Sequence, residues 1–159
     1  MSKAVLLEVL DFSRQKTLAL LEAIGKIPDP AKALAFRPAP GRAPLGWQLM
    51  HIGATDDRHV HLRMAAAAGD PKQPDLVRRF AGGSTPDDVT PTLADIKDYL
   101  TKSRELLLAK LATVPDADLD KKPSEQAPWT YREWIKVLTW HEAHHQGQAH
   151  LTFNMFKAQ

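Results

Sequence analysis

Four of the seven histidines lie in the C-terminal stretch of the chain, from Thr130 to Phe156. Two of them, His141 and His145, are four residues apart. On an α-helix this spacing puts both side chains on one face, with their Cβ atoms about 5–6 Å apart. Two imidazoles at that separation can bind the same metal ion, so this pair is the clearest indication of chemistry in the sequence.

The residues around the pair predict the helix that it needs. Thr130 as N-cap and Glu133 three residues later form a capping box, so the helix should begin at Tyr131. A lone inward histidine is most often a hydrogen-bonded core residue, whereas two of them one turn apart favour a metal site. Both histidines belong to a row of residues that recur at alternating steps of four and three, which is the row that a helix turns toward a core. The row is Trp134, Leu138, His141, His145, Gln148, Thr152 and Met155.

The composition restricts the ligands and partners of such a site. The chain has no cysteine, which excludes disulfides, thiolate ligands and a cysteine nucleophile and leaves imidazole and carboxylate groups to hold a metal. Its 21 basic and 19 acidic residues nearly balance and are scattered, so nothing indicates binding to nucleic acid or to an anionic membrane. No apolar run is long enough to span a bilayer, and we expect one cytoplasmic domain over residues 1–159.

Three further helices should position the pair. They are predicted from about Lys3 to Ile24 with Gly25 after the end, from about Leu45 to Ala68, and from a capping box at Thr92 and Asp95 to about Val114. The proline-rich segments 26–44 and 71–91 read as loops, the second with a short helical turn at Leu76 to Phe80 over a core edge. No alternating run indicates a strand. Four long helices joined by loops predict an all-α four-helix bundle.

A third ligand should come from a facing helix, because metal sites in bundles use inward side chains of different helices. A catalytic site of this kind needs three protein ligands and one open position. His51, in an apolar part of the second predicted helix, is the best candidate. His59 and His61 stand among charged residues and should lie on a solvated face. His144 is rotated by about 100° from His145 and should point away from the shared face.

Two segments of the chain resemble the DinB/YfiT-like superfamily of metalloenzymes. They are LGWQLMHIGATDDRH, which contains His51, and HEAHHQGQ, from His141 to Gln148. In that family a histidine of the second helix and an H-x-x-x-H pair of the last helix bind a divalent metal, which here implies His51, His141 and His145. HHQGQ is similar to the common HHRGQ, with Gln146 in place of the arginine. The resemblance implies an up-down-down-up four-helix bundle, often a homodimer, with nickel, zinc or iron in the pocket.

The resemblance also implies a function, because characterised members are similar to thiol-dependent S-transferases and to a mycothiol-dependent maleylpyruvate isomerase. We therefore expect a metal-dependent transferase, isomerase or hydrolase with a small-molecule substrate. Three neutral imidazoles leave the full positive charge on a bound metal, which can then lower the pKa of a bound water or thiol. Because the chain has no cysteine, such a thiol must be a small molecule from solution. Thr55 and Gln148 are expected beside the site, to contact the exogenous ligand or to hold the histidines, unless each only satisfies a neighbour. Arg37 and Arg42 are weaker candidates for a substrate carboxylate.

Two other functions fit parts of the pattern. Residues 141–145 also read H-E-x-x-H, the zinc-protease signature, with Glu142 as general base. Only fourteen residues follow His145 and none is Glu or Asp, so the third ligand is missing and Glu142 should lie on the surface. The stronger alternative is a noncatalytic bundle that binds a metal or another ligand through histidines with a structural or sensory role.

Overall fold

The computed structural model describes residues 1–64 and 73–159. Over these residues the chain is helical and has no strand, which confirms the all-α prediction. The four long helices are α1 (Lys3–Gly25), α3 (Leu45–His59), α5 (Leu93–Ala112) and α6 (Tyr131–Lys157). The shorter elements are α2 (Pro30–Ala35), the π-helical turn η1 (Val60–Met64) that continues α3, α4 (Pro74–Phe80) and the 3₁₀ turn η2 (Asp116–Asp118).

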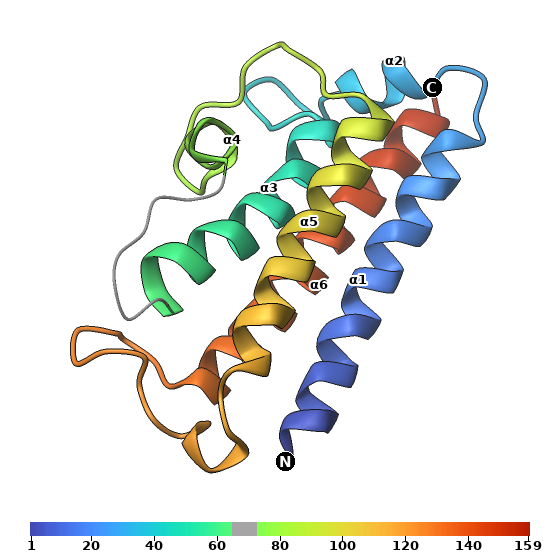
Figure 1. Ribbon diagram of the computed structural model, residues 1–159. Helices are drawn as coiled ribbons and strands as arrows, with labels where there is room; N and C mark the ends of the chain where they lie inside the picture. The colour runs from blue at the N-terminus through green and yellow to red at the C-terminus, as the bar shows by residue number, and fades with distance from the viewer. Residues whose placement is uncertain (65–72) are drawn as a thin grey trace.

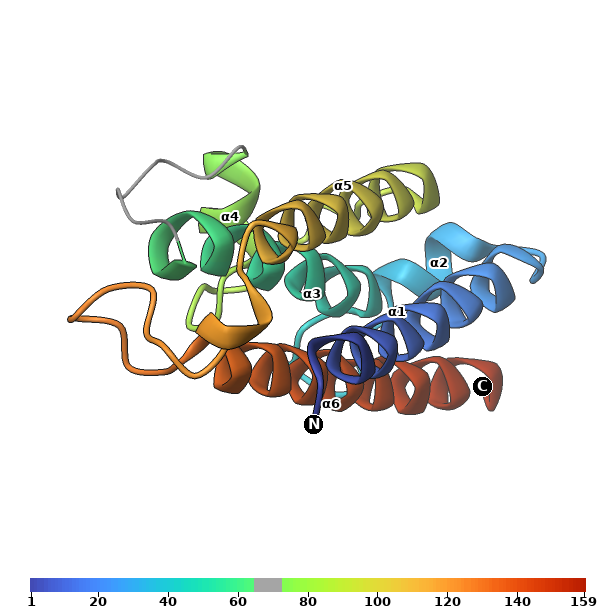
Figure 2. The ribbon, with the colours of Figure 1, turned by 60° about the horizontal axis from the view of Figure 1, so that its bottom comes forward.

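The four long helices lie side by side, with α1 and α6 running in one direction and α3 and α5 in the other (Figure 1). Helix α6 packs against α1 and α3, and α3 packs against α5. Figure 2 shows α3 in the middle, between α5 and α6. The short helices α2 and α4 also contact α3. Nearly every side of α3 is therefore covered, and its polar side chains must find partners inside the protein.

The starts of two long helices follow from local sequence. Thr92 accepts a hydrogen bond from the Asp95 amide at 3.1 Å, and Thr130 accepts one from the Glu133 amide at 3.2 Å, so both predicted capping boxes are confirmed. The first helix ends one residue later than predicted: Gly25 is its last residue, and the amide of Lys26 donates to carbonyls of the last turn.

The two predicted loops each contain a short helix. Segment 26–44 is interrupted by α2, which begins where Asp29 accepts a hydrogen bond from an amide of the first turn and a proline follows. Segment 71–91 contains α4, and Val77 and Phe80 are buried, in agreement with the predicted turn over a core edge. The predicted end of the second helix at Ala68 lies outside the described residues.

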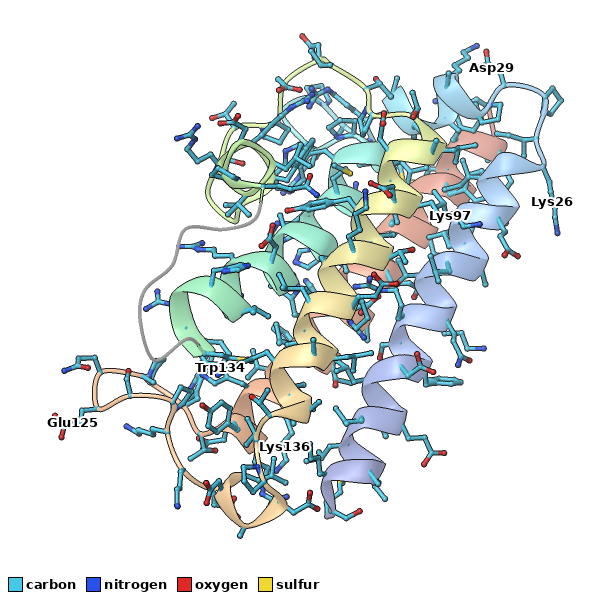
Figure 3. The ribbon with its side chains drawn as sticks, viewed as in Figure 1. Lys26, Asp29, Lys97, Glu125, Trp134 and Lys136 are labelled. Carbon is cyan, nitrogen blue, oxygen red and sulfur yellow. The ribbon has the colours of Figure 1, made fainter. Side chains whose placement is uncertain are left out.

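Two apolar clusters fill the interior, one toward each end of the four long helices. Between them lies a group of four ion-paired residues, one from each long helix, whose members are 1–5% exposed. We call these four residues the buried charge layer: Arg14 of α1, Asp56 of α3, Arg104 of α5 and Glu142 of α6. Lys26 and Glu125, by contrast, extend from the periphery of the molecule (Figure 3).

The two arginines and two carboxylates of the layer pair completely. Arg14 donates to Glu142 at 2.7 Å and to Asp56 at 3.0 Å. Arg104 donates to Asp56 at 3.0 Å and also bonds Glu142. Thr17 adds a hydrogen bond to Glu142 at 2.8 Å. Because the charges cancel and each carboxylate pairs with both arginines, these four residues can be buried where a single charge would be costly.

Candidate metal centre

The structure brings His51 of α3 together with His141 and His145 of α6. One ring nitrogen of each lies within 4.8 Å of the other two, and among residues 1–64 and 73–159 no other three metal-ligating side chains converge in this way. The Nε2 atoms of His51 and His141 are 3.1 Å apart. Two nitrogens that bind one zinc ion tetrahedrally at about 2.0–2.1 Å lie about 3.3 Å apart. The donor set therefore fits a divalent transition metal.

The ring of His51 is oriented by its neighbours. Its Nδ1 lies 2.6 Å from the carbonyl oxygen of Phe80. A carbonyl only accepts, so Nδ1 carries the proton and Nε2 presents its lone pair to His141. Trp47, one turn earlier on α3, stacks on the ring with centroids 5.1 Å apart and planes 10° apart. The end of α4 and a turn of α3 thus fix the direction in which this lone pair points.

Thr55 and Gln148, both expected beside the site, contact its histidines. The Nδ1 of His145 lies 3.0 Å from Oε1 of Gln148, and Gln148 donates from Nε2 to His144 at 3.0 Å. The hydroxyl of Thr55 donates to the backbone carbonyl one turn earlier at 2.9 Å and lies 3.3 Å from Nε2 of His141. Gln148 therefore directs the other ring nitrogen of His145 toward the group.

The environment keeps the three imidazoles neutral. Burial, reinforced by His145 and His51, lowers the pKa of His141 to about 3. Burial, reinforced by His51 and His144, lowers the pKa of His145 to about 4. Burial also lowers the pKa of His51, against the opposing hydrogen bond to Phe80. Ligating imidazoles must be neutral, and here protons compete weakly for the lone pairs at neutral pH.

A cavity of about 270 Å³ adjoins His51 and His141 between α3 and α6. Arg58 is the one charged residue among the described residues that line it. A second, more open hollow of about 470 Å³ reaches the group from the side of His145 and Gln148. The remaining lining of the first cavity is mostly apolar or aromatic: Ala54, Thr55, His59, Ala81, Gly82, Trp129, Val137 and Leu138.

The other described histidines are not part of the group, and for His59 and His61 the reason differs from the one predicted. His59 is half-buried against Trp134, with centroids 4.7 Å apart, and its Nδ1 lies 2.7 Å from a backbone carbonyl. His61 lies 3.5 Å from the buried carboxylate of Asp57. The predicted solvated face around these two is therefore wrong, because other elements cover α3 on almost every side. His144 is exposed and stacks on Trp140.

Glu142 belongs to the buried charge layer rather than to the histidine group. Its side chain is 1% exposed, and its oxygens accept hydrogen bonds from Arg14, Arg104 and Thr17. The prediction that Glu142 lies on the surface is wrong, because α6 buries one face against α1 as well as one against α3. A carboxylate held in this way cannot serve as the general base of a zinc protease, so residues 141–145 do not form a zinc-protease site.

Comparisons with known proteins give one family. A family model described as the DinB superfamily matches residues 9–149, a span that includes all three histidines of the group. The search of curated proteins finds no match for the chain. None of the helices in residues 1–64 and 73–159 has the length and apolar composition that crossing a membrane requires.

Proposed function

Because the chain belongs to the DinB superfamily, we propose that it is a metal-dependent enzyme whose metal is held by His51, His141 and His145. We also assign its four long helices to an up-down-down-up four-helix bundle. One observation carries the functional proposal: nitrogens of three imidazoles from two helices converge within 4.8 Å, and two of these imidazoles line a cavity. The donor set suits zinc, nickel or iron.

Neighbouring residues hold two of the three histidines in a fixed orientation. The Phe80 carbonyl and the Trp47 ring hold His51, and Gln148 holds His145. Hydrogen-bond partners of this kind set the tautomer and direction of a ligating imidazole. Three ligands leave one coordination position for a water or a substrate group. A bound divalent ion would polarise that group and lower its pKa toward neutrality.

The proposed reaction class rests on the resemblance to the thiol-dependent S-transferases and the mycothiol-dependent isomerase of this family. The chain has no cysteine, so a thiol that takes part must come from solution as a small molecule. The mostly apolar cavity beside His51 and His141 gives such a thiol and its acceptor a place to bind. We propose a thiol-dependent transferase, isomerase or hydrolase that acts on a small molecule.

The test combines metal analysis with kinetics. Protein prepared with zinc, nickel or iron should hold about one ion per chain, and His141→Ala should hold none. Each loaded form is then assayed with several low-molecular-weight thiols and small electrophiles, with metal-free protein as control. A rate that requires both metal and thiol supports the enzyme. One bound ion without a rate in any combination favours a noncatalytic metal-binding bundle, and the absence of bound metal would overturn the proposed site.

A further inference from the structure

Helix α3 carries a second group that faces the same cavity as the histidines. Arg58 follows His51 by seven residues, which is two helical turns, so both lie on one face about 10 Å apart along the axis. Both residues line the cavity of about 270 Å³, and Thr55 lies between them. The cavity is thus lined by His51 and, two turns farther along α3, by Arg58.

Arg58 differs from the other partly or fully buried arginines in having no carboxylate partner within the described part of the chain. Arg37, a weak candidate for substrate binding in the sequence, instead pairs with Asp88 at 2.9 Å. Neither Asp nor Glu is among the described residues that line the cavity. A half-buried arginine with no carboxylate partner among the described residues can bind the carboxylate of a ligand, whose two oxygens match the planar fork of guanidinium donors.

Building on the proposed function, we propose that the substrate is a small carboxylate whose acid group binds Arg58 while its other end reaches the three histidines. A cavity of this volume holds about nine water-sized atoms at about 30 Å³ each. Ala54, Val137 and Leu138 form an apolar wall along the cavity, which suits a hydrocarbon segment between the two polar ends. A positive ion at the histidines would add to the preference for an anion, since the ligands are neutral.

Matched probes test this inference by binding rather than by turnover. 6-Sulfanylhexanoate has nine non-hydrogen atoms, a thiol for the metal and a carboxylate for Arg58, and 6-sulfanylhexanamide has the same shape without the charge. Both are titrated into cobalt-loaded protein, where the absorption spectrum reports sulfur binding to the ion as the thiol proton leaves to solvent. The acid should bind about tenfold more tightly than the amide, the factor that one hydrogen bond to a charged group supplies.

The variants assign that preference to one residue. Arg58→Gln should remove the tenfold advantage of the acid and leave the affinity of the amide unchanged, and Arg58→Lys should keep part of it. Arg63→Gln changes an exposed arginine near the end of the same helical segment and should have no effect. Equal binding of acid and amide by the parent protein, or a preference for the acid that persists in Arg58→Gln, would overturn the inference.

A separate arm distinguishes failure of the inference from failure of the proposed function. If neither probe changes the cobalt spectrum, the thiol-dependent function is wrong. Hexanoate and hexanamide are then titrated into metal-free protein and followed by tryptophan fluorescence, because Trp129 lines the cavity. Tighter binding of hexanoate that Arg58→Gln abolishes supports the carboxylate site on its own, and equal binding refutes it.

Discussion

Replacing Glu142 by Gln removes one charge from the buried charge layer with almost no change in side-chain size. Glu142 is 1% exposed and pairs with Arg14 at 2.7 Å and with Arg104. In the variant only Asp56 would face two guanidinium groups, which leaves one uncompensated positive charge closed off from water. Removing one partner of a buried ion pair costs about 3–5 kcal/mol. A domain is typically stable by about 5–15 kcal/mol, so Glu142→Gln should lose a large fraction of its free energy of unfolding.

The assay is urea unfolding of the metal-free protein, followed by far-UV circular dichroism, since bound metal would stabilise the parent and variant by an additional amount. With a slope of about 2 kcal/mol/M, the midpoint should fall by about 2 M. Glu125→Gln is the matched control because Glu125 extends into solvent from a loop (Figure 3). Its stability should stay within about 0.5 kcal/mol of the parent.

Two measurements on Glu142→Gln, its stability and its activity, test the structural role given to Glu142. If Glu142→Gln unfolds at the same urea concentration as the parent, the carboxylate is not part of a closed ion-paired layer. If that stable variant also lost a metal-dependent hydrolysis, Glu142 would regain the role of a general base. We expect instead that metal content under native conditions stays near one ion per chain, because the carboxylate is engaged by Arg14, Arg104 and Thr17 rather than by the histidines.

Three further predictions concern the histidines. Elemental analysis should find no stoichiometric metal in His51→Ala, His141→Ala or His145→Ala, although each variant keeps its helix content. The control variant His61→Ala should bind metal as before. A full metal content in His51→Ala would mean that the third ligand is wrong. Gln148→Ala should weaken metal affinity about 10–100-fold by freeing His145, as measured by competition with a chelator, and an unchanged affinity would deny Gln148 that role. Burial holds the pKa of His141 at about 3 and that of His145 at about 4, whereas unfolded histidine titrates near 6.5. The unfolded state therefore binds protons that the folded state excludes, so the unfolding free energy of metal-free protein should be level above pH 6.5 and decline from there toward pH 4, less steeply in His141→Ala. A decline equally steep in that variant would contradict the lowered pKa.

Features that depend on neighbouring residues were predictable from the sequence. Two capping boxes located the starts of α5 and α6, and the spacing of His141 and His145 put both side chains on one face. His51 was harder, because only its apolar setting on another helix, together with the family resemblance, pointed to it. The structure adds the distances between the rings and the groups that orient them.

Features that depend on pairing between distant helices were not predictable. Arg14, Asp56, Arg104 and Glu142 lie on four different helices, and the periodicity of each helix alone gives a charged residue no reason to be buried. A helix packed on two sides buries a wider arc than one apolar stripe reveals, as α3 and α6 both show. The sequence did not single out Arg58 for the same reason. It lies in the run Asp56 to His59, where the charged residues suggested a solvated face.

The buried charge layer and the histidine group lie close together on α3 and α6. Glu142 directly follows His141 on α6, and Asp56 follows His51 by five residues on α3. The ion pairs therefore fix the position of α6 along α3. A shift of α6 by one turn would break the ion pairs and would also separate the imidazoles. A redesign of this protein for a new ligand can vary the cavity wall at Val137, but must keep the four ion-paired residues so that the three histidine nitrogens stay together.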